Sequence, residues 1–331
     1  MKRVVSVSLG SPARDHAVTL RLRGEEIRVE RRGVNGDLDA AVALLRALDG
    51  RVDAIGIGGI EFYLPIGPRR YHWRDAKRLR QAIRTSKVGD GNGLRALLAR
   101  RTVSALERQL RAEGRTLAGM PALSTTAIAR YALAEELVRA GCRLTCGDFM
   151  FALGLPIPLD SLGSVRTLGR ILLPLVTQLP YRWLYTLGDA QLAPPVEKWA
   201  SAYARATLIA GDFLQIRAHM PRDLRGKIIL TNTTTPRDVD DLRARGVRLL
   251  VTETPRLEGR SFGANVIEAL LLALTDKPPD RLDPADLDAL ADELGLLPSV
   301  EILAPAGDRV PDRKPEAAAG LRRTAITGGT G

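Results

Sequence analysis

The sequence predicts a two-domain α/β protein, in which a mixed α/β domain precedes a Rossmann-like domain with a doubly wound parallel sheet. Its 331 residues are enough for two domains of ordinary size. Short apolar runs end at glycines or polar residues, as buried strands do. After Gly114 these runs alternate with helical patterns, which is typical of a parallel sheet covered on both faces.

Residues 1–114 form the predicted N-terminal domain, which contributes the substrate and catalytic groups. The first three of its strands are short, alternating and joined by turns, so we expect an antiparallel meander. The fourth strand ends at Gly58 and Gly59, which we assign to a substrate-binding loop. The patterns predict strands at residues 3–10, 17–23, 25–31 and 52–57 and helices at residues 37–50, 74–84 and 94–110.

Residues 115–275 form the predicted dinucleotide-binding domain. A C-terminal helical segment, residues 276–303, starts at the cap Asp283-Pro284, and residues 304–331 form a tail that we expect to be disordered. The patterns predict strands at residues 116–123, 142–146, 207–210, 227–232 and 247–252 and helices at residues 125–140, 236–245 and 266–274.

The apolar stretch at residues 169–187 does not predict a membrane span. Pro174, Gln178, Pro180 and Arg182 interrupt it, and its apolar runs fall short of the ~20 residues that a bilayer requires. We expect a helix that is buried or covered by another subunit, which leaves a homodimer open. No membrane partner is expected. The N-terminus lacks the apolar core of a signal peptide, so we expect a cytoplasmic protein with reduced thiols.

The charge balance favours an anionic partner. Lys and Arg number 49 and Asp and Glu 38, a formal net charge of +11. A solvated, arginine-rich surface explains most of this charge, and a small anionic ligand comes next. Nucleic acid ranks third, because aromatic residues make up only 4% and no nucleic-acid motif is present. We predict no metal site. The histidines are His16, His72 and His219, and none has the spacing of a metal ligand from another histidine or from the two cysteines.

The first candidate for catalysis is Asp90, in the run Lys87-Val88-Gly89-Asp90-Gly91-Asn92-Gly93-Leu94. Glycines allow positive φ and close approach to a ligand, so an acid among three of them indicates a tight, site-forming turn. The alternative is that Asp90 only caps the helix that follows.

The second group of candidates follows the predicted strands of residues 115–275, at the edge where open parallel sheets bind ligands. The residues between the strand ending at 123 and its helix occupy the place of a dinucleotide-binding turn, with hydroxyl groups where glycines usually stand. Asp148 ends the next strand, where a carboxylate holds ribose and disfavours the 2′-phosphate of NADP. Simple capping and strand propensity are the alternatives. The cofactor candidates are Ser124, Thr125, Thr126, Asp148, Thr231, Asn232, Thr233 and Thr252.

Arg260 is the predicted anion ligand. It lies in Gly259-Arg260-Ser261-Phe262-Gly263-Ala264-Asn265, immediately before the most apolar helix of the chain. Its planar guanidinium group matches a carboxylate or phosphate. Asn265 joins it as a substrate-binding candidate.

The order of these motifs resembles that of the shikimate and quinate dehydrogenases over residues 87–275. Over residues 1–303 the chain more closely resembles the bacterial proteins called quinate 5-dehydrogenases. The resemblance to the second group depends on Gly211-Asp212-Phe213-Leu214, Thr231-Asn232-Thr233, and the Arg260 run with Asn265 and Glu268.

This resemblance implies hydride transfer between NAD or NADP, with NAD slightly favoured, and a ring hydroxyl of a small anionic polyol acid. It also implies an Asp and Lys pair for acid–base catalysis. Asp90 falls on the family's Asp-Gly-x-Gly motif, and Lys77 and Lys87 are the local lysines. Because the glycine fingerprint is absent, we also consider a non-redox binding or regulatory protein that holds an anionic metabolite in the interdomain cleft.

Overall fold

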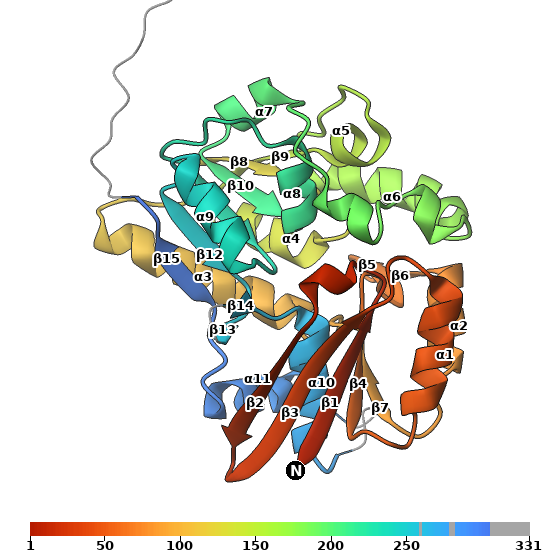
Figure 1. Cartoon of the computed structure of the whole chain (residues 1–331). Helices are drawn as coiled ribbons and strands as arrows, with labels where there is room; N and C mark the ends of the chain where they lie inside the picture. Colours follow the sequence, from red (N-terminus) through yellow and green to blue (C-terminus); the bar gives the residue numbers. More distant parts are fainter. Residues whose placement is uncertain (258–259, 278–281, 305–331) are drawn as a thin grey trace, which may run out of the picture.

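The computed structural model describes residues 1–257, 260–277 and 282–304, which form two α/β units (Figure 1). The first unit contains a five-stranded sheet in the order β2-β3-β1-β4-β7. The second contains a six-stranded sheet in the order β15-β12-β11-β10-β8-β9. Helices pack against both sheets, so the predicted fold class is confirmed. Residues 305–331, nearly all of the predicted tail, lie outside the described residues.

The first unit departs from the predicted meander. β2 and β3 form an antiparallel hairpin, but β1 pairs in parallel with β3 on one side and with β4 on the other. β1 is central because its residues from Val4 to Ser8 are all buried, which an edge strand of a meander would not allow. The elements are β1 (Lys2–Ser8), η1 (Pro12–Arg14), β2 (His16–Leu22), β3 (Glu25–Gly33), α1 (Leu38–Leu48), β4 (Ala54–Gly58), β5 (Tyr63–Ile66), β6 (Arg69–His72), α2 (Arg74–Gln81) and β7 (Lys87–Gly89).

The second unit has the predicted parallel sheet. All its strands run parallel except β15, which pairs antiparallel with β12. The helix predicted at residues 125–140 begins only at Tyr131, and residues 125–130 form turns. The elements are β8 (Pro121–Ser124), α4 (Tyr131–Arg139), β9 (Arg143–Cys146), α5 (Asp148–Leu153), α6 (Leu162–Val176), η2 (Tyr181–Trp183), η3 (Asp189–Leu192), α7 (Ala200–Arg205), β10 (Leu208–Gly211), α8 (Phe213–His219), β11 (Ile228–Thr231), α9 (Pro236–Ala244), β12 (Leu249–Thr252) and β15 (Ser299–Ile302).

Two predicted domain assignments are wrong. The short strands β13 (Arg256–Leu257) and β14 (Arg260–Ser261) lead from β12 to α10 (Ala264–Leu274), which packs on β1, β4 and β7 of the first sheet. Residues 276–303 are not wholly helical either, because after α11 (Pro284–Glu293) the chain returns to the second sheet as β15. Both segments follow apolar contacts that are distant in sequence, and no local pattern reveals such contacts.

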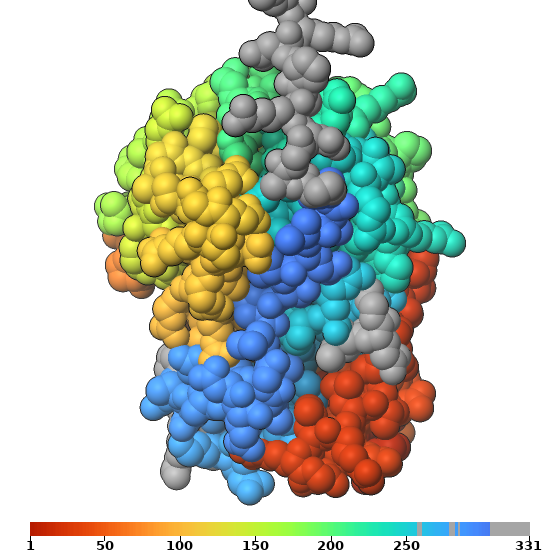
Figure 2. Space-filling model, turned by 90° about the vertical axis from the view of Figure 1, so that its left-hand side faces the viewer, coloured from red at the N-terminus to blue at the C-terminus, as the bar shows by residue number. Residues whose placement is uncertain are grey.

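The helix α3 (Arg95–Ala112), which the sequence predicts at residues 94–110, crosses from the first unit to the second. Figure 2 shows it running alongside the final segment of the described chain. Arg101 near its middle pairs with Asp288 and Asp292 of α11. At its far end Glu113 pairs with Arg248, which directly precedes β12. The units are therefore joined by α3, by the segment between β12 and α10, and by the segment between α11 and β15.

The predicted helix at residues 169–187 is α6, which begins and ends earlier. Val165, Gly169 and Leu173 are buried, whereas Ile171 and Leu175 are exposed. Within the described ranges, no helix combines the length and the apolar character that crossing a bilayer requires.

The bridging role of α3 is testable at Leu106, which is fully buried in the main apolar core. Leu106→Ala should lower the free energy of unfolding by about 2–5 kcal/mol, because it removes apolar contacts and leaves a cavity. Urea denaturation measures this loss. The matched control Leu175→Ala, at a position 71% exposed, should change stability by less than about 0.5 kcal/mol. Similar losses of unfolding free energy in both variants would show that the packing of α3 does not stabilise the core.

Candidate functional site

A cleft of about 470 Å³ lies between the two units. Its walls include Gly10, Gly58 and Asp90, which follow or end strands of the first sheet, and Thr126 and Asp212, which follow strands of the second. The carboxyl ends of both sheets therefore face one another across it. This is where open α/β sheets bind ligands, and the volume suits a small metabolite.

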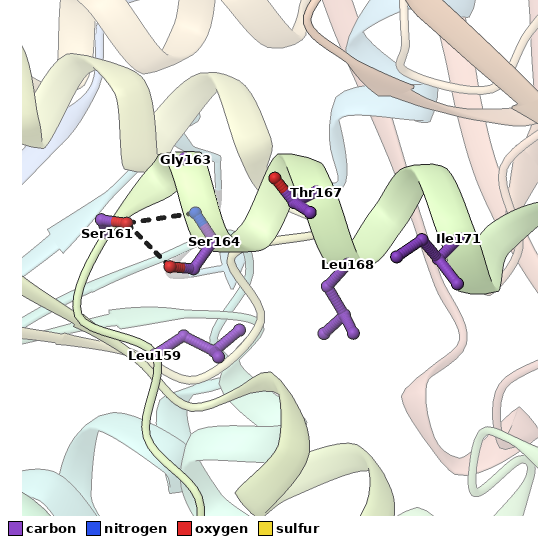
Figure 3. A pocket seen from close by; sticks show the side chains of 7 residues that line it. All are labelled: Leu159, Ser161, Gly163, Ser164, Thr167, Leu168 and Ile171. Atoms are coloured by element: carbon purple, nitrogen blue, oxygen red, sulfur yellow. Dashed lines mark hydrogen bonds between the residues drawn. The ribbon is translucent and has the colours of Figure 1, made fainter.

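A second hollow, of about 500 Å³, lies along α6 (Figure 3). It is open to solvent, and no charged side chain lines it. The Ser161 hydroxyl accepts a hydrogen bond from the Ser164 N–H (3.1 Å) and lies 3.0 Å from its hydroxyl, so it serves to cap the helix. The interdomain cleft is accordingly the candidate site.

Three arginines converge on one end of the cleft, and we call Arg14, Arg31 and Arg260 the arginine cluster. Arg31 is held by Asp15 Oδ1 at 2.6 Å and by the Ser8 hydroxyl at 3.0 Å. Burial, together with Arg14 and Arg260, lowers the pKa of Arg31 to about 10 despite Asp15. Arg14 acts on both of the other guanidinium groups and Arg260 acts on Arg31, so all three contribute to one positive region of the cleft.

Arg260 is the least compensated member of the arginine cluster. Arg14 lies 3.6 Å from Asp238 and Arg31 pairs with Asp15, but no carboxylate of the described residues forms an ion pair with Arg260. Its Nη1 donates only a 3.4 Å hydrogen bond to the Asp15 carbonyl oxygen. Burial and then Arg14 lower its pKa. The sequence predicted Arg260 but missed Arg14 and Arg31, because nothing local separates them from the other arginines.

Asp90 lines the cleft, but its carboxylate is engaged by its own neighbourhood. Oδ2 accepts from the Phe62 N–H at 2.6 Å and from the Asn92 side-chain amide at 2.7 Å, and Oδ1 accepts from the Asn92 N–H at 3.1 Å. These bonds fix the turn that leads into α3. The capping alternative is close to what the structure shows, although the helix starts at Arg95, beyond the bonded residues.

Glu268 of α10 binds the other side of this turn, although the sequence indicated it only as part of a family motif and not as a site residue. It accepts from the Gly91 N–H at 2.6 Å and the Gly93 N–H at 3.1 Å. A Cβ at Gly89 would lie 2.8 Å from Glu268, so the glycines are needed for this approach. Burial, and then the nearby Asp90 carboxylate, raise the pKa of Glu268 to about 7.

The predicted Asp and Lys pair is not assembled. Lys87 Nζ donates to the carbonyl oxygens of Leu272 (3.0 Å) and Thr275 at the end of α10. Lys77 is exposed on α2, and neither lysine lines the cleft. Lys87 is the first residue of β7, whereas Asp90 follows its last residue, so the two side chains lie at opposite ends of the strand. Assigning Lys77 or Lys87 to catalysis therefore disagrees with the geometry.

The predicted diphosphate turn is closed by its own side chains. Asp148 is buried and its Oδ1 accepts the Ile128 N–H at 2.8 Å, while burial raises its pKa to about 6. Thr125 is packed so closely that a Cβ at Gly211 would lie 2.1 Å from its hydroxyl. Neither Ser124, Thr125 nor Asp148 lines the cleft. These residues do not fit a bound diphosphate or ribose, and NAD binding stays a prediction.

The remaining candidates divide into two groups. Thr231 donates to the Gly211 carbonyl oxygen (2.8 Å) and Thr252 to that of Thr254 (3.0 Å), so both hydroxyls are structural. Six others line the cleft: Gly58, Gly59, Thr126, Asn232, Thr233 and Asn265. A Cβ atom added at Gly58 would lie 3.2 Å from the side-chain amide nitrogen of Asn265. This amide donates a hydrogen bond to Ser6 Oγ at 2.8 Å. The structure thus brings both predicted glycines and Asn265 to one wall.

No group of three or more His, Cys, Asp or Glu side chains in the described ranges could hold a metal ion. Cys142 and Cys146 are buried and free. Burial raises the pKa of both thiols, to about 11 and 12 respectively. They therefore behave as packing residues.

Two families match the chain. Residues 93–303 match a family described as a domain of unknown function (DUF8754), and residues 3–90 match a second one (DUF8753). The chain belongs to the DUF8754 family. The junction, residues 91–92, falls in the turn held by Glu268. No curated protein matches the chain.

Several solved structures are distantly similar. A galactofuranose-binding protein is 13% identical with a TM-score of 0.34, covering 89% of this chain and 99% of that one. The arabinose-binding component of a Shewanella sp. ANA-3 transporter is 13% identical with a TM-score of 0.31, covering 89% and 85%. A putative malic enzyme is 12% identical with a TM-score of 0.35, covering 89% and 85%. With TM-scores below 0.5, these likenesses carry no functional argument.

The raised pKa of Glu268 predicts a pH dependence of stability. A carboxyl group with a folded pKa near 7 and an ordinary unfolded value of 4.5 stabilises the fold fully below pH 4.5. This contribution is lost as the pH rises through 7, and its size is about 3 kcal/mol. In urea denaturation the wild type should therefore lose stability relative to Glu268→Gln between pH 4.5 and 7.5. Parallel curves for the two proteins would contradict the assignment.

Proposed function

We propose that this chain is a non-redox binding or regulatory protein that holds a small anionic metabolite in the interdomain cleft. The observation that carries this proposal is the arginine cluster. Its members come from η1, β3 and β14, and Arg260 has no described carboxylate partner. Burial, and then the neighbouring arginines, lower the pKa of Arg31 and Arg260, and an anion at this place would relieve the repulsion among them.

The other arginines of the cleft differ from this cluster. Arg95 pairs with Glu61 at 2.5 Å and also donates to the Ala129 carbonyl oxygen at 2.8 Å, joining the two units. Arg130 pairs with Glu253 at 2.8 Å. Their charges are balanced by buried or half-buried carboxylates, so they organise the cleft walls. The uncompensated positive charge lies at the end formed by the arginine cluster.

The dehydrogenase prediction has less support. Its acid–base pair requires a lysine near Asp90, and Lys87 instead bonds the end of α10. The N–H of Ile128, a donor that could contact a phosphate, is used by Asp148. Quinate 5-dehydrogenase activity stays a prediction. Titration of quinate with NAD or NADP present, followed by the absorbance of the reduced nicotinamide, tests it directly.

The binding proposal predicts that Arg260→Gln weakens the binding of a small anionic polyol acid. Removing a charged hydrogen-bond donor should cost about 2 kcal/mol, which is roughly thirtyfold in Kd. Isothermal titration of the full chain with quinate, glucuronate and glucose 6-phosphate measures this, and binding should weaken with added salt. Arg111→Gln on the exposed face of α3 is the matched control and should leave Kd unchanged.

Absence of binding by all three anions would overturn the proposal. Equal loss in the Arg260 and Arg111 variants would also contradict it, because a general charge effect would then replace the site.

A further inference from the structure

We infer that the wall of the cleft at the carboxyl edge of the second sheet is a hydroxyl-binding subsite, formed by Thr126, Asp212, Gln215 and Asn232. The ligand class is then an anion that carries several hydroxyl groups on the same small molecule, a sugar acid or a sugar phosphate. This inference deepens the proposed function and rests on it.

The topology places these residues together. β8, β10 and β11 are neighbours in the second sheet, with Ser124 beside Ala210 and Gly211 beside Thr231. Thr126, Asp212 and Asn232 follow these three strands at the same carboxyl edge. Gln215 lies one turn into α8, which begins directly after Asp212. All four residues line the cleft.

Asp212 and Asn232 are oriented before any ligand arrives. The Asn232 amide donates to Asp212 Oδ2 at 2.6 Å, and Asn232 Oδ1 accepts from the Phe213 N–H at 3.1 Å. Asp212 Oδ1 accepts from the Leu214 N–H at 3.0 Å, which caps α8. A carboxylate has about four acceptor positions and an amide nitrogen two donor hydrogens. The Asp212 carboxylate can therefore accept a further hydrogen bond, and the Asn232 amide beside it can donate one. Two neighbouring hydroxyl groups of a ligand would match this pair.

Two other polar atoms of this wall lack a partner among the described residues. The Thr126 hydroxyl and the Gln215 side-chain carbonyl oxygen are both buried and make no hydrogen bond. A buried polar group without a partner costs free energy, so such groups are usually satisfied by a ligand or water. Hydroxyl groups of a ligand can donate a hydrogen bond to the Gln215 oxygen and accept one from the Thr126 hydroxyl. A purely apolar or purely anionic ligand could satisfy only one of these atoms or neither.

Arg130 adds a donor at the same place. Its Nη1 is used by Glu253, whereas its Nη2 lies 3.9 Å from Asp212 Oδ2, beyond hydrogen-bond distance. The subsite therefore combines acceptors and donors at one edge, with its charges largely balanced. The arginine cluster, in the same cleft, supplies the excess positive charge. A ligand that satisfies both must carry an anionic group as well as hydroxyl groups.

Two pairs of probes test this inference on the full chain by isothermal titration. Quinate is compared with cyclohexanecarboxylate, which keeps the carboxylate and ring but lacks the hydroxyls. Glucose 6-phosphate is compared with cyclohexyl phosphate in the same way, which separates the two sources of the anion. The hydroxylated member of at least one pair should bind about tenfold or more tightly. Equal binding within both pairs would overturn the inference but leave the proposed function standing, whereas no binding by any of the four would end both.

Two variants identify the residues responsible. Asp212→Asn keeps a residue that caps helices well but loses the carboxylate, and Gln215→Met keeps the shape but removes the unpartnered oxygen. Each should reduce the preference for the hydroxylated probe severalfold, and neither should weaken the binding of cyclohexanecarboxylate, because neither removes a positive charge. Gln81→Met, exposed on α2, is the control and should leave the preference intact.

Thermal melting separates this role from a structural one. Because the Gln215 oxygen has no described partner, Gln215→Met should leave the melting temperature equal or higher. A lower melting temperature together with an unchanged preference would assign Gln215 to the packing of α8 and overturn its role in the subsite.

Discussion

The cleft depends on the packing of α10 against the face of the first sheet, over β1, β4 and β7. The helix reaches this sheet from the second unit, and glycines allow it to come close: a Cβ at Gly56 would lie 2.9 Å from the Asn265 carbonyl oxygen. At the next strand Glu268 binds the backbone of the turn after β7. One helix therefore fixes the end of β4, the turn that presents Asp90 and the start of α3, and with them the distance between the facing sheet edges.

This arrangement explains why two carboxylates stay close together in a poorly solvated place. Asp90 accepts the Asn92 N–H and Glu268 accepts two further N–H groups of the same turn, and burial raises the pKa of both carboxyl groups. The N–H donors offset part of the cost of burying charge. The acid among three glycines, which resembles a catalytic turn in the sequence, is thus a device for joining α10 to the sheet. Its position at the cleft is a consequence of that joint.

The sequence predicts local features well and distant contacts poorly. The helix α1, the glycine-terminated strand β4, the helix α3 and the parallel strands of the second sheet are all visible in the residue pattern. The pairing of β1 between β3 and β4, the return of α10 and the return of β15 are not, because each depends on partners far away in the chain. Among site residues, Asn232 and Thr233 were accessible through strand-end rules, and Arg260 through its guanidinium group just before the most apolar helix. Asp212 follows the same rule and could have been found in that way.

The second sheet also shows how a Rossmann-like edge can be used differently. In dinucleotide-binding turns, glycine lets phosphate reach the N–H groups at the start of a helix. In this chain α4 starts only at Tyr131, Asp148 takes the Ile128 N–H, and Thr125 packs against Gly211. Because negative charge from the protein itself occupies this position, the polar groups left facing the cleft are those of Thr126, Asp212 and Asn232, at the neighbouring strand ends. The anion site proposed for this chain is instead the arginine cluster, where guanidinium groups would replace helix N–H donors.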